Sequence, residues 1–185
     1  MISPSEFLEL ATTRQSTRAY DEKQRVEREK LLRIVESARM APSACNSQPW
    51  HMIVVDDENM CKRVANALAS NGMNKFALDA TAHIIIVEER PNFTSWIGGI
   101  VKNKHFPHID CGILCSYITM AATCEGLGNC ILGWFDEKKL RKLLGVPRNH
   151  RILLDIALGY TTAPLREKIR KPIEEIVTYN EYSTR

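Results

Sequence analysis

Basic and hydroxyl side chains cluster at two places that lie far apart in the sequence. Arg14-Gln15-Ser16-Thr17-Arg18 follows the first apolar segment, and Lys168 and Arg170 alternate in a basic run near the end of the chain. Guanidinium and ammonium groups bind phosphate through charge-assisted hydrogen bonds. In an extended segment, residues two apart share a face, so Lys168 and Arg170 could clasp one phosphate. The alternatives are a solvated polar turn and a solvated basic tail, which are common for such runs.

A second segment is rich in neutral hydrogen-bonding groups. It reads Ala-Pro-Ser-Ala-Cys-Asn-Ser-Gln-Pro-Trp over residues 41–50. Ser43, Asn46 and Gln48 offer hydroxyl and amide groups that can bind the edge of a heterocycle, while the prolines fix the path of the backbone. A rigid turn that bonds its own backbone is the alternative, but the density of these groups beside Trp50 favours a ligand site at least as strongly.

Glycines mark a third segment, Gly-Leu-Gly-Asn-Cys-Ile-Leu-Gly-Trp over residues 126–134. They could let a planar ring approach the backbone closely. The spacing is not the Gly-x-Gly-x-x-Gly of a dinucleotide-binding turn, which excludes a Rossmann site here. An ordinary helix cap followed by a strand is the alternative.

Four residues with metal-binding side chains occur close together: His105, His108, Cys111 and Cys115. Structural zinc sites usually show paired Cys-x-x-Cys spacing, which is missing here, and Pro107 interrupts the run. Both cysteines also fit an apolar helix as small core residues. We therefore predict core packing for the cysteines and no metal site, with structural zinc as the weaker alternative.

Helices and strands alternate along the chain. Ser3, Pro4 and Glu6 form a capping box that begins a first helix, and Asp136 caps a short one that ends at Gly145. Apolar spacing predicts further helices over residues 31–38, 59–69 and 109–124 and strands over residues 51–55, 84–87, 129–132 and 152–160. Residues 89–108 read as a loop or short helix and residues 161–185 as an extended arm. This order predicts one α+β domain over residues 1–185, with a central mixed sheet flanked by helices.

Composition limits the class of protein. The chain has 185 residues, a net charge of +3, 44% hydrophobic residues and six cysteines. These values are typical of a globular domain, and no apolar run approaches the ~20 residues of a membrane span. The N-terminus lacks a basic signal-peptide region. We therefore expect a cytoplasmic protein with free thiols and no membrane partner. A nucleic-acid-binding module is an alternative, although no known motif accompanies its basic residues.

Taken together, these motifs resemble the nitroreductase family of flavin-dependent oxidoreductases. The matching elements follow the family's order from residue 14 to residue 172, and Ala-Pro-Ser-x-x-Asn-x-Gln-Pro-Trp is the most specific of them. The others are Arg-x-Ser-x-Arg, Asp110, Glu-Gly-Leu-Gly at 125–128, Gly-Trp-Phe-Asp at 133–136, Leu-Gly-Val-Pro at 144–147, Leu-Gly-Tyr at 158–160 and Arg-Lys-Pro at 170–172.

The resemblance implies an intertwined homodimer that joins through long apolar helices, with each FMN site built from both subunits. Its phosphate and ribityl chain would bind Arg14, Gln15, Ser16 and Arg18, with Lys168 and Arg170 completing the phosphate clasp. The partner subunit would contribute Pro42, Ser43, Ala44, Asn46 and Gln48. Backbone groups of Leu132, Gly133 and Trp134 would face the flavin. Whether Asn74 or Lys75 touches the ring is open.

The resemblance also implies the reaction. NADH or NADPH would deliver hydride to flavin N5 and leave, and a small-molecule acceptor such as a nitroaromatic or a quinone would then be reduced. Flavin performs this chemistry itself, so no catalytic side chain is needed. A flavin-binding protein of the same fold with a specialised dehydrogenase or sensing role is the alternative.

Overall fold

A four-stranded sheet forms the centre of the computed structural model, which describes residues 2–183 without the side chain of residue 71. The strand order is β1-β2-β4-β3. Their bounds are Trp50–Val55 for β1, Ala82–Glu88 for β2, Gly128–Leu132 for β3 and Arg151–Gly159 for β4. Every ladder between these strands is antiparallel. The predicted parallel component is limited to one bridge, between Ser16 and Asn129.

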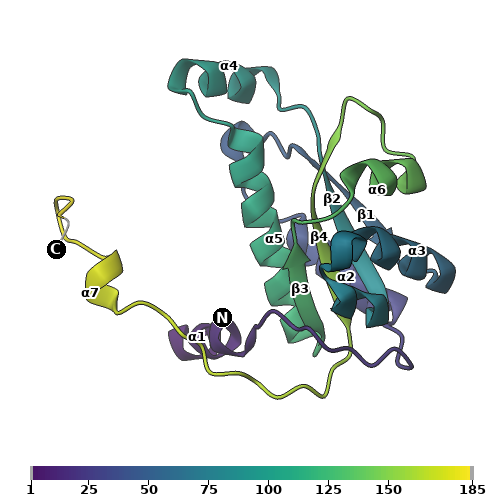
Figure 1. Cartoon of the computed structure of the whole chain (residues 1–185). Helices are drawn as coiled ribbons and strands as arrows, with labels where there is room; N and C mark the ends of the chain where they lie inside the picture. The colour runs from purple at the N-terminus through teal and green to yellow at the C-terminus, as the bar shows by residue number, and fades with distance from the viewer. Residues whose placement is uncertain (1, 184–185) are drawn as a thin grey trace.

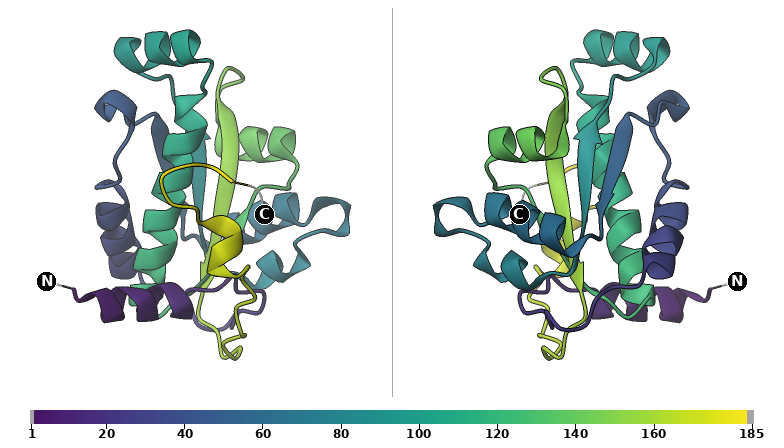
Figure 2. Two further views of the ribbon diagram at one scale, coloured as in Figure 1. Left: turned by 90° about the vertical axis from the view of Figure 1, so that its left-hand side faces the viewer. Right: turned by 90° about the vertical axis from the view of Figure 1, so that its right-hand side faces the viewer.

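Helices cover both faces of the sheet (Figures 1 and 2). One face packs against α2 (Arg28–Ala38) and α5 (Phe106–Cys124), and the other against α3 (Glu58–Leu68) and α6 (Glu137–Leu144). Side chains of β2 alternate between the two cores, with Ile84 in the first and Ile85 in the second. This confirms the α+β fold class and explains why β2 is a continuous apolar run.

Within the described residues, three further helices lie at the periphery of the molecule. The N-terminal helix α1 (Pro4–Thr13) has the predicted capping box at Ser3. Within residues 89–108, predicted as a loop or short helix, α4 (Phe93–Lys102) forms a helix that projects from one end of the molecule (Figure 1). The short helix α7 (Ile173–Ile176) interrupts the extended arm, which leads away from the body. The remaining elements are the 3₁₀ turns η1 (Ala44–Asn46), η2 (Ser70–Gly72) and η3 (Lys75–Asp79).

The long helix α5 begins three residues before the predicted start. Pro107 lies in its first turn, where a missing N–H costs nothing because first-turn N–H groups have no partner within the helix. The proline therefore starts this helix and does not interrupt it. Leu114 and Ile118 are fully buried, whereas Ile109 is 52% exposed. Within residues 2–183, no helix is long and apolar enough to cross a bilayer.

Candidate functional site

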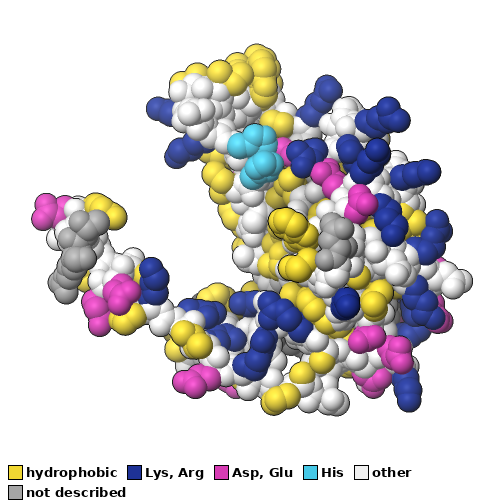
Figure 3. Space-filling view, viewed as in Figure 1, with side chains coloured by type: hydrophobic (Ala, Val, Ile, Leu, Met, Phe, Trp, Pro, Cys, Tyr) yellow, Lys and Arg dark blue, Asp and Glu magenta, His cyan; other side chains and the backbone are white. Residues whose placement is uncertain are grey.

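The two basic segments of the sequence meet in one hollow of about 410 Å³. Figure 3 shows a patch of Lys and Arg side chains beside the start of the arm. The residues that line the hollow are Arg14, Gln15, Ser16, Arg18, Arg166, Glu167, Lys168, Ile169 and Arg170. Every residue predicted for the phosphate end of the site is among them, and Arg166 joins them. We call this group the cation hollow.

Backbone pairing holds the first segment of the cation hollow against the sheet. The N–H of Thr17 donates to the carbonyl of Asn129 at 2.8 Å, beside the parallel bridge of Ser16. The buried Asn129 side chain donates in turn to the carbonyl of Thr119, near the carboxyl end of α5. Residues 14–18 therefore extend the edge of β3 at that end of the helix.

The arm closes the hollow from the other side. The ammonium group of Lys168 donates to the carbonyl of Arg14 at 2.6 Å, and the Arg166 guanidinium donates to the carbonyl of Ser16 at 2.5 Å. The Gln15 side chain donates to the carbonyl of Pro164 and accepts from the N–H of Arg166. These contacts bring together segments about 150 residues apart in sequence.

One carboxylate, that of Glu167, lines the hollow beside five basic side chains. Within residues 2–183, none of its Arg or Lys side chains forms an ion pair. Desolvation, followed by repulsion from Arg14, Arg170 and Arg166, lowers the pKa of Lys168. A bound anion would relieve this repulsion, so the hollow is suited to a phosphate group.

From the hollow, a row of side chains leads to the turn after β3. The Arg18 guanidinium carbon lies 5.8 Å from the centre of the Phe76 ring. Nearby, Asn74 has a positive φ of 53° and donates to the carbonyl of Trp134 at 2.7 Å. Asn74 is thus tied to the predicted Gly133–Trp134 turn, whereas Lys75 is exposed.

The three residues predicted at that turn differ in exposure. Gly133 is exposed and Trp134 is 67% exposed, but Leu132 is only 4% exposed. The Leu132 side chain lies in the core beneath the sheet. It therefore cannot contact a ligand, and only its backbone could contribute to a site.

Residues 42–48, which we call the strained segment, lie at the other end of α5. The N–H of Ala44 donates to Asp110, near the start of the helix, at 3.1 Å. Cys45, Asn46 and Gln48 all have positive φ, at 53°, 49° and 47°. Such backbone conformations cost energy in residues other than glycine and are common at functional sites.

Polar groups of the strained segment partly satisfy one another. The Ser43 hydroxyl accepts from the N–H of Gln48 at 2.9 Å, and the Gln48 amide donates to the carbonyl of Asn46 at 3.2 Å. The self-bonded turn that we considered from the sequence is therefore present. Pro42, Asn46 and Gln48 remain exposed, so the segment still presents a polar surface.

The two predicted groups of residues do not meet within one chain. Asp110 and Thr123 are thirteen residues apart on α5, which at 1.5 Å per residue is about 20 Å. The strained segment contacts the first of these ends, and Asn129, beside the cation hollow, contacts the second. One chain therefore presents two half-sites at opposite ends of a helix.

The cysteines of the zinc alternative are core residues. Cys111 and Cys115 are buried. Burial raises the pKa of each thiol to about 12, with smaller contributions from the charges of Glu88 and Asp110 at Cys111. A protonated buried thiol is a poor metal ligand, which supports the packing interpretation.

Two residues of this region were not predicted from the sequence: Arg166, which lines the hollow, and Phe76, which lies beside Arg18. Arg166 lies two residues before Lys168, so the alternation that selected Lys168 and Arg170 could also have selected it. Phe76 gave no signal, because a single aromatic residue in a 3₁₀ turn has no distinctive spacing.

The chain is similar in sequence to known proteins. The Nitroreductase family model matches residues 11–73 and 69–160. An Archaeoglobus fulgidus protein, provisionally named NADH dehydrogenase/NAD(P)H nitroreductase, is 32% identical over 163 residues, which cover 84% of this chain and 85% of the relative.

Solved structures are similar along most of the chain. A nitroreductase family protein from Clostridium novyi NT is 30% identical, with a TM-score of 0.74 over 88% of this chain and 89% of its own. An FMN-dependent nitroreductase from Clostridium difficile R20291 is 26% identical, with the same TM-score over 95% and 99%. The motif-based resemblance is therefore confirmed, and the chain belongs to the nitroreductase family.

Proposed function

We propose that the chain is an FMN-dependent NAD(P)H oxidoreductase and that the cation hollow binds the FMN phosphate. The observation that carries the proposal is the convergence of five basic side chains, from two distant segments, without an ion-pair partner among the described residues. A phosphate monoester carries nearly two negative charges at neutral pH. Its oxygens match the donors that Arg14, Arg18 and Lys168 present.

The rest of the row suits a planar ring. Phe76 and Asn74 lead from the hollow to the exposed backbone at Gly133. Gly133 is exposed, and a Cβ added there would make only an ordinary van der Waals contact with a Leu154 methyl at 3.5 Å. When bound, FMN would supply the hydride and electron transfer. The residues here would bind and orient it.

A homodimer is part of the proposal. The strained segment lies too far from the cation hollow of its own chain, and a second copy would bring it to the ring. An apolar hollow of about 490 Å³ along α5 is lined in part by Phe7, Tyr117 and Met120, which suits burial against that copy. Each of the six cysteines, all within the described residues, is free, which agrees with the expected cytoplasmic location.

The test begins with the absorbance spectrum of the purified protein, before and after addition of FMN. We expect a yellow protein with about one FMN per chain, and a colourless protein that fails to take up FMN would overturn the proposal. Anaerobic addition of NADH or NADPH should then bleach the flavin, and a nitroaromatic or quinone should restore its colour. A protein that binds FMN but resists both nucleotides would instead support the specialised or sensing role.

A further inference from the structure

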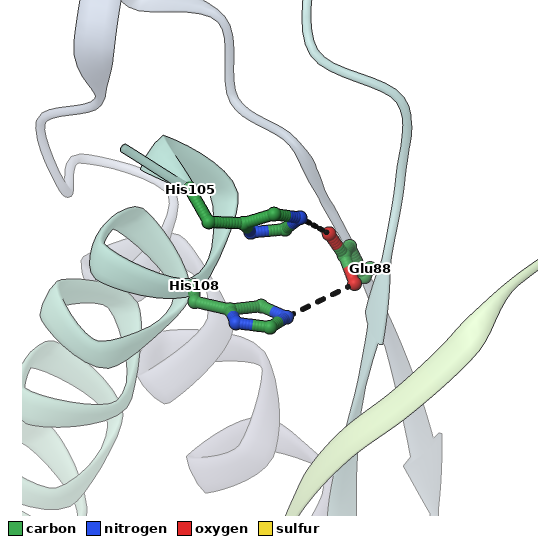
Figure 4. Close-up of side chains that lie close together, drawn as sticks. All are labelled: Glu88, His105 and His108. Atoms are coloured by element: carbon green, nitrogen blue, oxygen red, sulfur yellow. Dashed lines mark ion pairs between the residues drawn. The ribbon is translucent and has the colours of Figure 1, made fainter. Parts of the chain in front are cut away.

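Two imidazoles and a carboxylate converge where the α4 excursion leaves and rejoins the body (Figure 4). Glu88 is the last residue of β2, His105 is the N-cap of α5, and His108 lies in its first turn. The Nε2 atoms of His105 and His108 each lie 3.3 Å from a different oxygen of Glu88. The ligand atoms of all three residues lie within 4.8 Å of one another.

Both histidines lie within ion-pair distance of Glu88. At 3.3 Å, both contacts are longer than a usual N–H···O hydrogen bond. The two rings lie with their centres 3.9 Å apart, and both side chains are more than half exposed. Imidazole nitrogen and carboxylate oxygen are both common ligands of divalent transition metals.

The spacing fits a small divalent ion. Zinc binds imidazole nitrogen and carboxylate oxygen at about 2.0–2.2 Å, which places neighbouring tetrahedral ligand atoms about 3.3–3.6 Å apart. Both contacts of Glu88 measure 3.3 Å. A small closing movement of the exposed histidines would bring all three groups onto one ion.

We propose that Glu88, His105 and His108 form a binding site for a divalent transition metal such as Zn²⁺. Two histidines and a glutamate leave a fourth position for water or another ligand. That position adjoins a hollow of about 450 Å³ whose lining includes Trp96, Ile100 and Phe106. From the sequence we predict no metal site, because paired Cys-x-x-Cys spacing is missing and Pro107 lies within the run, and the zinc alternative there includes Cys111 and Cys115 in place of Glu88.

A metal here would join both ends of the α4 excursion. Glu88 precedes α4 in the chain and both histidines follow it, so one ion would fix the base from which α4 projects (Figure 1). Lys102 and Lys104 are exposed in this excursion and provide trypsin sites within it. The bound metal should therefore slow cleavage at these two lysines.

The site uses none of the residues assigned to FMN, so its test is independent of the proposed function. Protein treated with a chelator and then dialysed should be titrated with Zn²⁺ alone by calorimetry. Two exposed cysteines, Cys45 and Cys124, are replaced by serine in every sample to remove competing thiols. We expect one ion per chain, and no saturable binding would overturn the proposal.

Single variants localise the ion. Glu88→Gln, His105→Ala and His108→Ala should each weaken binding by more than about tenfold, since even outer-shell residues have effects of this size. His150→Ala is the matched control, because His150 also contacts one glutamate, Glu89 at 3.0 Å, but has no second histidine beside it. Binding that all three variants retain within twofold, or that the control loses equally, would refute the site.

Cobalt and trypsin give two further readouts. Co²⁺ in this site should show ligand-field bands without thiolate charge-transfer absorption, and strong thiolate absorption would place the ion elsewhere. Zn²⁺ should slow tryptic cleavage at Lys102 and Lys104 in the parent protein but not in Glu88→Gln. Equal protection in both proteins would contradict the assignment.

Discussion

The two ends of α5 differ in how their charged and polar groups are satisfied. At its carboxyl end, the cation hollow gathers like charges from two distant segments, and no described carboxylate neutralises them. At its amino end, the strained segment bonds its neutral polar groups to itself and to Asp110. Among the described residues, the cations at the carboxyl end have no ion-pair partner, whereas the polar groups at the amino end are already hydrogen-bonded. A phosphate would complete one end, and a flat polar ligand held by another chain would complete the other.

This contrast suggests that the two ends of α5 bind different parts of the proposed ligand. The hollow is assembled by one chain, so one chain could hold the phosphate even before a partner adds to the ring end. Local hydrogen bonds and the contact with α5 fix the left-handed residues of the strained segment. Four changes test this division, beginning with the helix that separates the two ends.

Leu114→Ala should have the largest effect, because it removes a fully buried side chain from the middle of α5. A cavity of this kind lowers the free energy of unfolding by about 2–5 kcal/mol. Urea denaturation followed by circular dichroism measures the loss. Ile109→Ala is the control on the same helix, since Ile109 is 52% exposed. Equal losses in the two variants would show that the ends do not depend on a shared buried helix.

The second-largest effect is expected for Arg14→Ala and Arg170→Ala, each of which should weaken FMN binding. Loss of one charge-assisted contact costs about 1.5–3 kcal/mol, which is roughly a tenfold to 150-fold increase in Kd. Quenching of flavin fluorescence during titration measures this change. Lys138→Ala, which removes an exposed cation from α6, should leave Kd unchanged. Normal FMN binding by both arginine variants would remove the phosphate from the cation hollow.

Replacing each of the two exposed cysteines with glycine should change the free energy of unfolding in opposite directions. Cys45 has a φ of 53°, which costs a residue with a side chain about 1–2 kcal/mol, whereas Cys124 is the last residue of α5. Cys45→Gly should raise the free energy of unfolding by up to about 1 kcal/mol, after the entropy cost of glycine. Cys124→Gly should lower it by about 0.5–1 kcal/mol.

Thermal unfolding of both cysteine variants decides this prediction. Destabilisation by Cys45→Gly would mean that the left-handed conformation carries no strain at the amino end. The two changes would then no longer distinguish the ends of α5.

Arg33→Ala should have the smallest effect and depend on pH. Arg33 of α2 donates through two nitrogens to Glu125, just after α5, at 2.7 Å each. These bonds lower the pKa of the Glu125 carboxyl. A carboxyl with a lowered folded-state pKa adds stability above its unfolded pKa and loses it as pH falls through the folded value. The variant should therefore lower Tm by at most about 2 °C at neutral pH and match the parent at strongly acidic pH.

Scans at several pH values measure this difference. Arg39→Ala removes an exposed pair with Glu36 on the same helix and serves as the control. A Tm difference for Arg33→Ala that persists unchanged into acid would show that the effect does not come from the Glu125 carboxylate.

Local signals predicted much of the fold because they depend on neighbouring residues. The capping box at Ser3 and the continuous apolar run of β2 both formed as expected. Because glycines and prolines weaken the helix signal, residues 89–108 are predicted as a loop or short helix, and the chain forms the helical alternative as α4. The relative direction of the strands was predicted less well. The periodicity of apolar residues indicates which faces are buried but not which strands are neighbours.

The basic residues of the cation hollow were predicted more completely than their surroundings. Arg14, Arg18, Lys168 and Arg170 carried a charge pattern that a family resemblance could join. Phe76 and Glu88 had no such pattern, because each contributes only through what the fold places beside it. The core packing predicted for Cys111 and Cys115 is confirmed, since both thiols are buried in the apolar helix α5.

The sequence by itself determined the chain's family, its element order and the chemical character of its functional segments. These depend on residue type and local spacing, which any copy of the chain carries. Tertiary structure alone decided that residues 14–18 meet residues 164–170, that the strained segment lies about 20 Å away along α5, and that Glu88 faces His105 and His108. Such contacts join segments far apart in sequence, so they are fixed only when both faces of the sheet are packed.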